Sequence, residues 1–96
     1  MSILDVKWTR PAISDLIEAQ SYIEQENPQA AKMIAKRIWN GAKSLSEQPR
    51  VGRKGQVEGT REWVIQRTPY LIVYRISATQ IEILHLYHGK QNWQNR

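Results

Sequence analysis

The sequence contains no cysteine. Disulfide bonds, thiolate nucleophiles and cysteine-ligated zinc sites are therefore excluded, and the composition fits a reducing compartment. No stretch approaches the roughly 18 to 20 consecutive apolar residues that span a membrane. Residues 1–7 lack the basic segment and the long apolar core of a signal peptide. Because 96 residues can bury one core, we expect a single domain over residues 1–96, cytoplasmic and without membrane association.

Acidic side chains are also scarce, and they are unevenly placed. The chain has 14 lysines and arginines against 9 aspartates and glutamates, a net charge of +5. Residues 1–26 carry a net charge of −3, whereas residues 27–96 carry 12 basic against 4 acidic side chains, a net charge of +8. Such a basic region indicates either an anionic partner, nucleic acid or an acidic protein, or an ordinary solvated surface.

The first half of the chain predicts one strand and two helices. Residues 3–9 alternate in apolarity, as in a half-buried strand. Thr9 with Pro11, and later Asn27 with Pro28, combine a capping side chain with a proline in the first helical turn. The first helix should end near residue 25 and the second near Pro49, and their short link predicts an antiparallel pair. The apolar stripes are Ile13, Leu16, Ile17, Ala19 and Ile23, then Ala31, Ile34, Ile38, Ala42 and Leu45.

The second half predicts a loop and three strands. Residues 49–60 are rich in glycine and charge, which is typical of a loop. Residues 61–67, 70–76 and 81–87 read as strands, and their short links make them antiparallel neighbours in a meander. The predicted fold class is α+β: an N-terminal strand, an antiparallel αα-hairpin, then a three-stranded antiparallel meander, with the helices on one side of a small sheet.

Polar and aromatic residues gather where the last predicted strand ends, which is where a small fold often keeps its function. His85 shares the parity of apolar neighbours and is expected to be structural, whereas His88 is a candidate for target contact or catalysis. Two histidines without cysteine or metal-ligand spacing predict no metal site. Of the four tryptophans, Trp8, Trp39 and Trp63 are expected in the core or at its border, and Trp93 is expected to be exposed.

Three segments, in this order and spacing, resemble a known family. They are Gly59-Thr-Arg-Glu62, the run Thr-Pro-Tyr-Leu-Ile-Val-Tyr-Arg at residues 68–75, and Ile83-Leu-His-Leu-Tyr-His-Gly-Lys-Gln-Asn-Trp93. Together with the order of the predicted elements, they make nearly the whole chain similar to the RelE/ParE superfamily of bacterial toxins from type II toxin–antitoxin modules. The resemblance implies a toxin that needs no cofactor and is neutralised by a cognate antitoxin.

The superfamily holds two activities on one scaffold, so the fold alone does not distinguish them. RelE-like members cleave mRNA in the ribosomal A site, and ParE-like members inhibit DNA gyrase. Cleavage requires cations that stabilise the developing phosphate charge, and RelE-like toxins place them on the central strands. Those positions are Glu62, Val64 and Leu71 here, and a further basic position is Gln91. The missing cations favour a ParE-like gyrase inhibitor that is not an enzyme.

Two alternatives stay open. In a RelE-like, ribosome-dependent mRNA endoribonuclease, the catalytic set would be His88, Arg67 and Lys90. His88 also fits the His-x-x-x-Asp pattern of ParE-like members, although Asn92 stands in place of the acid, so this histidine does not decide between the activities. The other alternative is a degenerate toxin that retains only antitoxin binding.

The resemblance also suggests which residues meet each partner. The target, DNA gyrase or alternatively the ribosome and mRNA, would be contacted by His88, Lys90, Asn92 and Trp93. An acidic antitoxin would meet Lys36, Arg67 and Arg75, in a possible hetero-oligomer. A further basic cluster in the predicted loop, Arg50, Arg53 and Lys54, is most simply a solvated turn.

Overall fold

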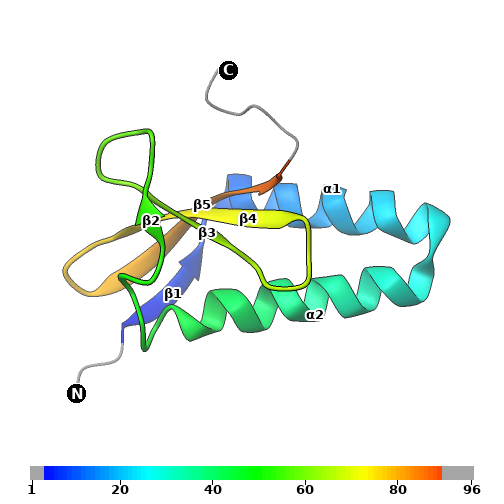
Figure 1. The fold of residues 1–96 in the computed structure, drawn as a ribbon, viewed down its shortest axis with the longest axis horizontal. Helices are drawn as coiled ribbons and strands as arrows, with labels where there is room; N and C mark the ends of the chain where they lie inside the picture. The colour runs from blue at the N-terminus through cyan, green and yellow to red at the C-terminus, as the bar shows by residue number, and fades with distance from the viewer. Residues whose placement is uncertain (1–3, 90–96) are drawn as a thin grey trace.

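A computed structural model describes residues 4–89 (Figure 1). Its element order is β1 (Asp5–Trp8), α1 (Arg10–Glu26), α2 (Pro28–Ser44), β2 (Arg53–Lys54), β3 (Arg61–Val64), β4 (Tyr70–Ile76) and β5 (Gln80–His88). The α+β class and the antiparallel helix pair are confirmed, and the turn between the helices projects past the end of the sheet (Figure 1). No helix among the described residues is long and apolar enough to cross a membrane.

Both helices begin where the capping residues predict. The Thr9 hydroxyl accepts a hydrogen bond from the Ala12 N–H, and the Asn27 side chain accepts one from the Ala30 N–H at 3.1 Å. These contacts satisfy N–H groups that have no partner inside the helix. Because Asn27 also ends α1, by donating its N–H to the Ile23 carbonyl, one residue separates the helices and forces them to run antiparallel.

The sheet has five strands in the order β1-β5-β4-β3-β2. The meander of β3, β4 and β5 is confirmed, and β1 joins it as the parallel neighbour of β5. Three boundaries differ clearly from prediction. The second helix ends at Ser44, before the expected end near Pro49. The glycine-rich segment contains the short strand β2, which pairs antiparallel with β3, and β3 ends at Val64 instead of continuing to residue 67.

One face of the sheet packs on the helices and forms the core. Residues of β4 and β5 meet the small alanines of α1 and α2, which allow the helices to approach closely. The buried core comprises Ala12, Ile38, Ala42, Leu45, Ile65, Tyr70, Ile72, Tyr74, Ile81, Ile83 and Leu86. We call the opposite face, which carries Glu62, Val64, Leu71, Val73, His85 and Tyr87, the open face because the core lies on the other side, although Glu62, Leu71 and Val73 are themselves buried.

A β-bulge changes the phase of β5. Tyr74 pairs with Ile83 and Val73 pairs with His85, so Leu84 is an extra residue without a partner in β4. Strict alternation from Ile83 would place His85 on the core face, but after the bulge it is Leu86 that is buried. The bulge therefore moves His85 to the open face.

Two apolar predictions were wrong in detail. Trp39, expected in or beside the core, is 54% exposed and stacks on Trp8 with ring centroids 6.3 Å apart. Ile13 and Ile17, expected in the buried stripe of the first helix, are 44% and 59% exposed, while Ala12 is fully buried. The inner face of α1 is thus rotated from the stripe that spacing alone predicts. Trp8 and Trp63 are half-buried at the core border, as expected.

Candidate functional site

The strand register gathers the positions at which a RelE-like nuclease would need cations. Val64 pairs with Leu71, and Leu71 pairs with Tyr87, so these three side chains form one row across the open face. The adjacent row runs from Glu62 through Val73 to His85. Paired residues of neighbouring strands lie on the same face with their side chains in reach. The centre of the open face is therefore apolar, not cationic.

The carboxylate of Glu62 is already neutralised by a neighbour on β2. Its exposed fraction is 4%, and its Oε1 accepts hydrogen bonds from the Arg53 guanidinium at 3.0 Å and 3.3 Å. The other oxygen accepts from the Gln56 N–H at 3.4 Å. A buried carboxylate needs such partners, because an unpaired charge away from water is costly. The ion pair offsets the charge of Glu62, while the Arg53 side chain itself remains 70% exposed at the edge strand β2.

His88 lies at the opposite end of β5 from the turn between β4 and β5. It pairs with Tyr70, and the two rings meet edge to face with centroids 5.4 Å apart. Paired residues lie on the same face of a sheet, and Tyr70 belongs to the core. His88 is therefore on the helix-covered face and not on the open face that carries Leu71. Burial of Tyr70, and to a lesser extent the nearby Tyr22, raises the pKa of the Tyr70 hydroxyl.

The turn that contains Arg67 reaches the same end of the sheet. The Gly89 N–H donates to the Pro69 carbonyl, which ties this turn to the end of β5. Arg67 adopts a φ of 63°, an uncommon conformation for a residue with a side chain, and its carbonyl accepts a hydrogen bond from the Arg37 guanidinium at 3.1 Å. The structure thus brings Arg67 and His88 to one end of the sheet. Lys90, Asn92 and Trp93 lie outside the described residues.

The bases expected to meet the antitoxin are dispersed. Arg67 precedes β4 and Arg75 lies near its far end, so the strand's length separates them, and Lys36 is exposed on α2. Arg75 forms an ion pair with Glu82. That hydrogen bond, with a second from Gln80, lowers the pKa of the Glu82 carboxyl. The structure therefore does not gather the three bases into one patch.

The start of α1 completes the edge of β5 beyond the end of β1. The Thr9 hydroxyl donates to the Ile83 carbonyl at 2.7 Å, and the Asp15 carboxylate accepts the Leu86 N–H at 3.1 Å. The same oxygen of Asp15 lies 3.1 Å from Nδ1 of His85. These contacts give His85 a structural partner. Asp15 was missed because only the bulge exposes that N–H to α1.

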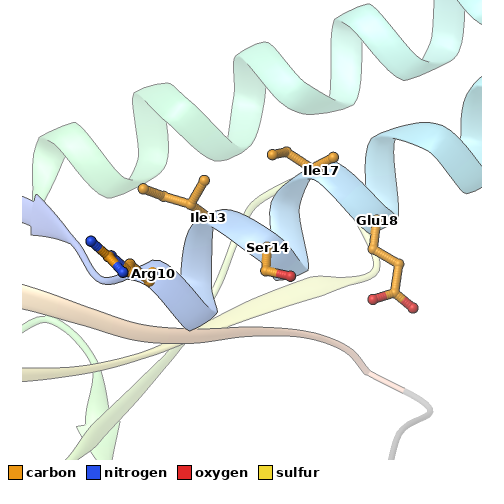
Figure 2. A pocket seen from close by; sticks show the side chains of 5 residues that line it. All are labelled: Arg10, Ile13, Ser14, Ile17 and Glu18. Atoms are coloured by element: carbon orange, nitrogen blue, oxygen red, sulfur yellow. The ribbon is translucent and has the colours of Figure 1, made fainter.

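An apolar groove on the outside of α1 was also missed. Figure 2 shows Ile13 and Ile17 projecting from the same side of the helix, with Arg10 at one end and Glu18 at the other. These residues and Ser14 line an open depression of about 370 Å³. Exposed isoleucines side by side are typical of a surface that another protein covers. The signal was present in the sequence as apolar spacing, but it was interpreted as core.

The sequence of residues 6–93 matches the family described as ParE toxin of type II toxin-antitoxin system, parDE. The chain belongs to this family of toxins. Among its relatives, the protein Y4kP of Sinorhizobium fredii is 41% identical over 97% of this chain and 96% of its own length. Toxin RelE2 of Caulobacter vibrioides is 36% identical over 88% of this chain and 93% of its own length.

Comparison with solved structures also finds proteins of toxin–antitoxin systems. The chain is similar to a protein of the chromosomal ParDE toxin–antitoxin system from P. aeruginosa, with a TM-score of 0.82 and 26% identity over 90% of this chain and 96% of that one. It is also similar to a chain of the RelBE2 toxin–antitoxin complex from Mycobacterium tuberculosis, with a TM-score of 0.59 and 26% identity over 92% and 93%. The resemblance to the RelE/ParE superfamily is thereby confirmed.

Proposed function

We propose that this ParE-family toxin inhibits DNA gyrase and is neutralised by a cognate antitoxin. The observation that carries the proposal is that Val64 and Leu71, two positions where an RNA-cleaving relative would need cations, are paired in an apolar row that Tyr87 extends. A phosphate being cleaved requires positive groups held on rigid elements, and residues on a loop do not easily replace them in geometry. Glu62 beside this row carries a negative charge that Arg53 offsets, so the pair adds little net positive charge for a phosphate.

The similarity of the backbone to solved toxin structures also supports the ParE-like function. At an equal identity of 26%, the TM-score is 0.82 for the ParDE protein and 0.59 for the RelBE2 chain. The backbone is therefore nearer to the ParE-type arrangement than sequence identity alone would indicate.

A supercoiling assay tests the proposal directly. Purified toxin is expected to block the supercoiling of relaxed plasmid by gyrase, and the cognate antitoxin should restore it. The double substitution Lys90→Ala/Trp93→Ala should weaken this inhibition, because these residues are expected to contact the target. The control Lys32→Ala removes the same charge from the exposed face of α2 and should inhibit like wild type. Full gyrase activity with excess folded toxin contradicts the proposal.

A ribosome-dependent mRNA endoribonuclease is the second candidate. It is favoured by the name of the Caulobacter relative, RelE2, and by the position of Arg67 and His88 at one end of the sheet. Primer extension on mRNA from cells that express the toxin distinguishes the two. Codon-phased cuts that disappear in His88→Ala support the nuclease, whereas intact messages together with DNA-damage signalling support gyrase inhibition.

The antitoxin is proposed to cover the groove on α1. A segment with apolar side chains would bury Ile13 and Ile17, and an acidic side chain beside it would meet Arg10. Substituting Ile17 by Asp places a charge in the centre of this contact and should weaken antitoxin binding at least 30-fold, about 2 kcal/mol. The control is Val57→Asp, because Val57 is exposed to a similar extent, 54% against 59% for Ile17, but lies in the loop before β3. Equal affinities of both variants would place the antitoxin elsewhere.

A further inference from the structure

A basic hollow lies at the β2 edge of the sheet, away from the groove on α1. It encloses about 330 Å³ and is lined by Arg50, Lys54, Gly59, Thr60, Arg61 and Ile76. The three cations come from the segment before β2, from β2 and from β3. We refer to this hollow as the edge pocket.

The cations of the edge pocket are placed against one another. Lys54 and Arg61 are direct partners across β2 and β3, so two like charges face each other, an arrangement that destabilises a sheet. Within residues 4–89, none of Arg50, Lys54 and Arg61 forms an ion pair with a carboxylate, because Glu62 is paired with Arg53. The repulsion is therefore not compensated inside the described part of the chain.

The backbone holds this arrangement in place. The Arg61 guanidinium donates to the Gly52 carbonyl at 2.7 Å and to the Arg50 carbonyl at 3.4 Å, which fixes one cation without neutralising its charge. Gly59 has a φ of 83°, and no atom of a non-adjacent residue lies within 4 Å of the place where its Cβ would be. The edge pocket is therefore open to solvent beside Gly59. An anion entering the pocket would meet the hydrogen-bonded Arg61 guanidinium and the exposed side chains of Arg50 and Lys54.

We propose that the edge pocket binds the phosphate backbone of nucleic acid. A protein segment gains its affinity largely by burying apolar surface, whereas contacts to phosphate are dominated by lysine and arginine. Ile76 is the one large apolar side chain among the six residues that line the edge pocket, which favours phosphate over an acidic polypeptide. This inference is independent of the target, since the pocket is separate from the open face and from the end of β5.

Fluorescence anisotropy with a labelled DNA duplex of arbitrary sequence, measured over a range of salt concentrations, tests the proposal. For the wild type, the logarithm of the binding constant should fall linearly with the logarithm of salt concentration. Arg50→Ala/Lys54→Ala removes two contacts and should reduce that slope by about 1.8, which is about 60-fold in affinity near 0.1 M salt. Both side chains are exposed, so the fold should be retained.

The control Lys32→Ala/Lys43→Ala removes the same net charge from exposed positions of α2 and should retain most of the slope. A second readout is stability: Lys54→Gln relieves the repulsion with Arg61, so it should bind duplex more weakly and yet unfold at a higher temperature than wild type. A structural role of Lys54 would lower both quantities.

Single-stranded RNA and inorganic phosphate serve as further probes. Binding of RNA with a similar slope supports a general phosphate-backbone site, and competition only by high phosphate concentrations supports the same chemistry. Three results overturn the proposal: equal losses in both double variants, an unchanged slope in Arg50→Ala/Lys54→Ala, and displacement of the duplex by polyglutamate at equal charge concentration.

Discussion

The hydroxyl of Tyr74 joins β4 to the segment that leads into β2. It donates to the Pro49 carbonyl at 2.8 Å and accepts the Gly52 N–H at 2.9 Å, and the side chain is fully buried. Gly52 approaches so closely that a Cβ atom there would lie 2.6 Å from this hydroxyl. The substitution Tyr74→Phe keeps the ring and deletes both hydrogen bonds.

The expected cost follows from what is left behind. The Gly52 N–H becomes a buried donor without a partner, which costs about 1–3 kcal/mol, whereas the half-exposed Pro49 carbonyl can recover water and costs less. We therefore expect Tyr74→Phe to lower the free energy of unfolding by about 2–3 kcal/mol. For a domain of this size, that corresponds to a decrease of about 10–20 °C in Tm.

Urea unfolding followed by circular dichroism measures this loss as a shift of the midpoint at constant slope. The matched control is Tyr70→Phe, because Tyr70 is also buried in β4 but its hydroxyl forms no hydrogen bond within residues 4–89. That variant should unfold within about 0.5 kcal/mol of wild type, as is usual where no specific contact is lost. A Tyr74→Phe protein as stable as Tyr70→Phe would refute the reasoning.

Three further predictions concern pH and the edge of β5. Burial raises the pKa of Tyr74 above 10.0, so the unfolded chain releases this proton first, and stability should fall as the pH rises past 10 more steeply in wild type than in Tyr74→Phe. Arg75 lowers the pKa of Glu82 below 4.5, so the advantage of wild type over Arg75→Gln in urea midpoint should be complete above pH 4.5 and disappear as the pH falls through the lowered value. Asp15→Ala leaves the Leu86 N–H without its acceptor and should cost about 1 kcal/mol in the same unfolding assay, whereas Asp15→Asn, which keeps an acceptor oxygen, should cost less.

Local signals in the sequence predicted the local structure well. The capping side chains of Thr9 and Asn27 located both helix starts, and the apolar run at residues 70–76 gave β4 with its observed bounds. What could not be predicted depends on contacts between distant residues. The parallel pairing of Asp5 with Gln80 joins the two ends of the described chain, and no turn or spacing near either residue encodes it.

The candidate site shows the same division. The resemblance identified Glu62, Val64 and Leu71 as the informative positions, and the strand register brings them together on the open face. Burial did not follow from periodicity, because the bulge at Leu84 reverses the alternation of β5 and the close packing of Ala12 turns Ile13 and Ile17 outward. The edge pocket likewise depends on the pairing of β2 with β3, within a segment that composition describes as a loop.

The position of β5 between β1 and β4 has a consequence for biosynthesis. During translation, the first strand emerges long before the strand that it must pair with, and it stays without a partner until residues 80–88 have left the ribosome. A chain that stops before that point lacks the strand that joins β1 to β4, so β1 has no partner in the sheet. Such a truncated chain should be degraded by proteases and should not act as a toxin.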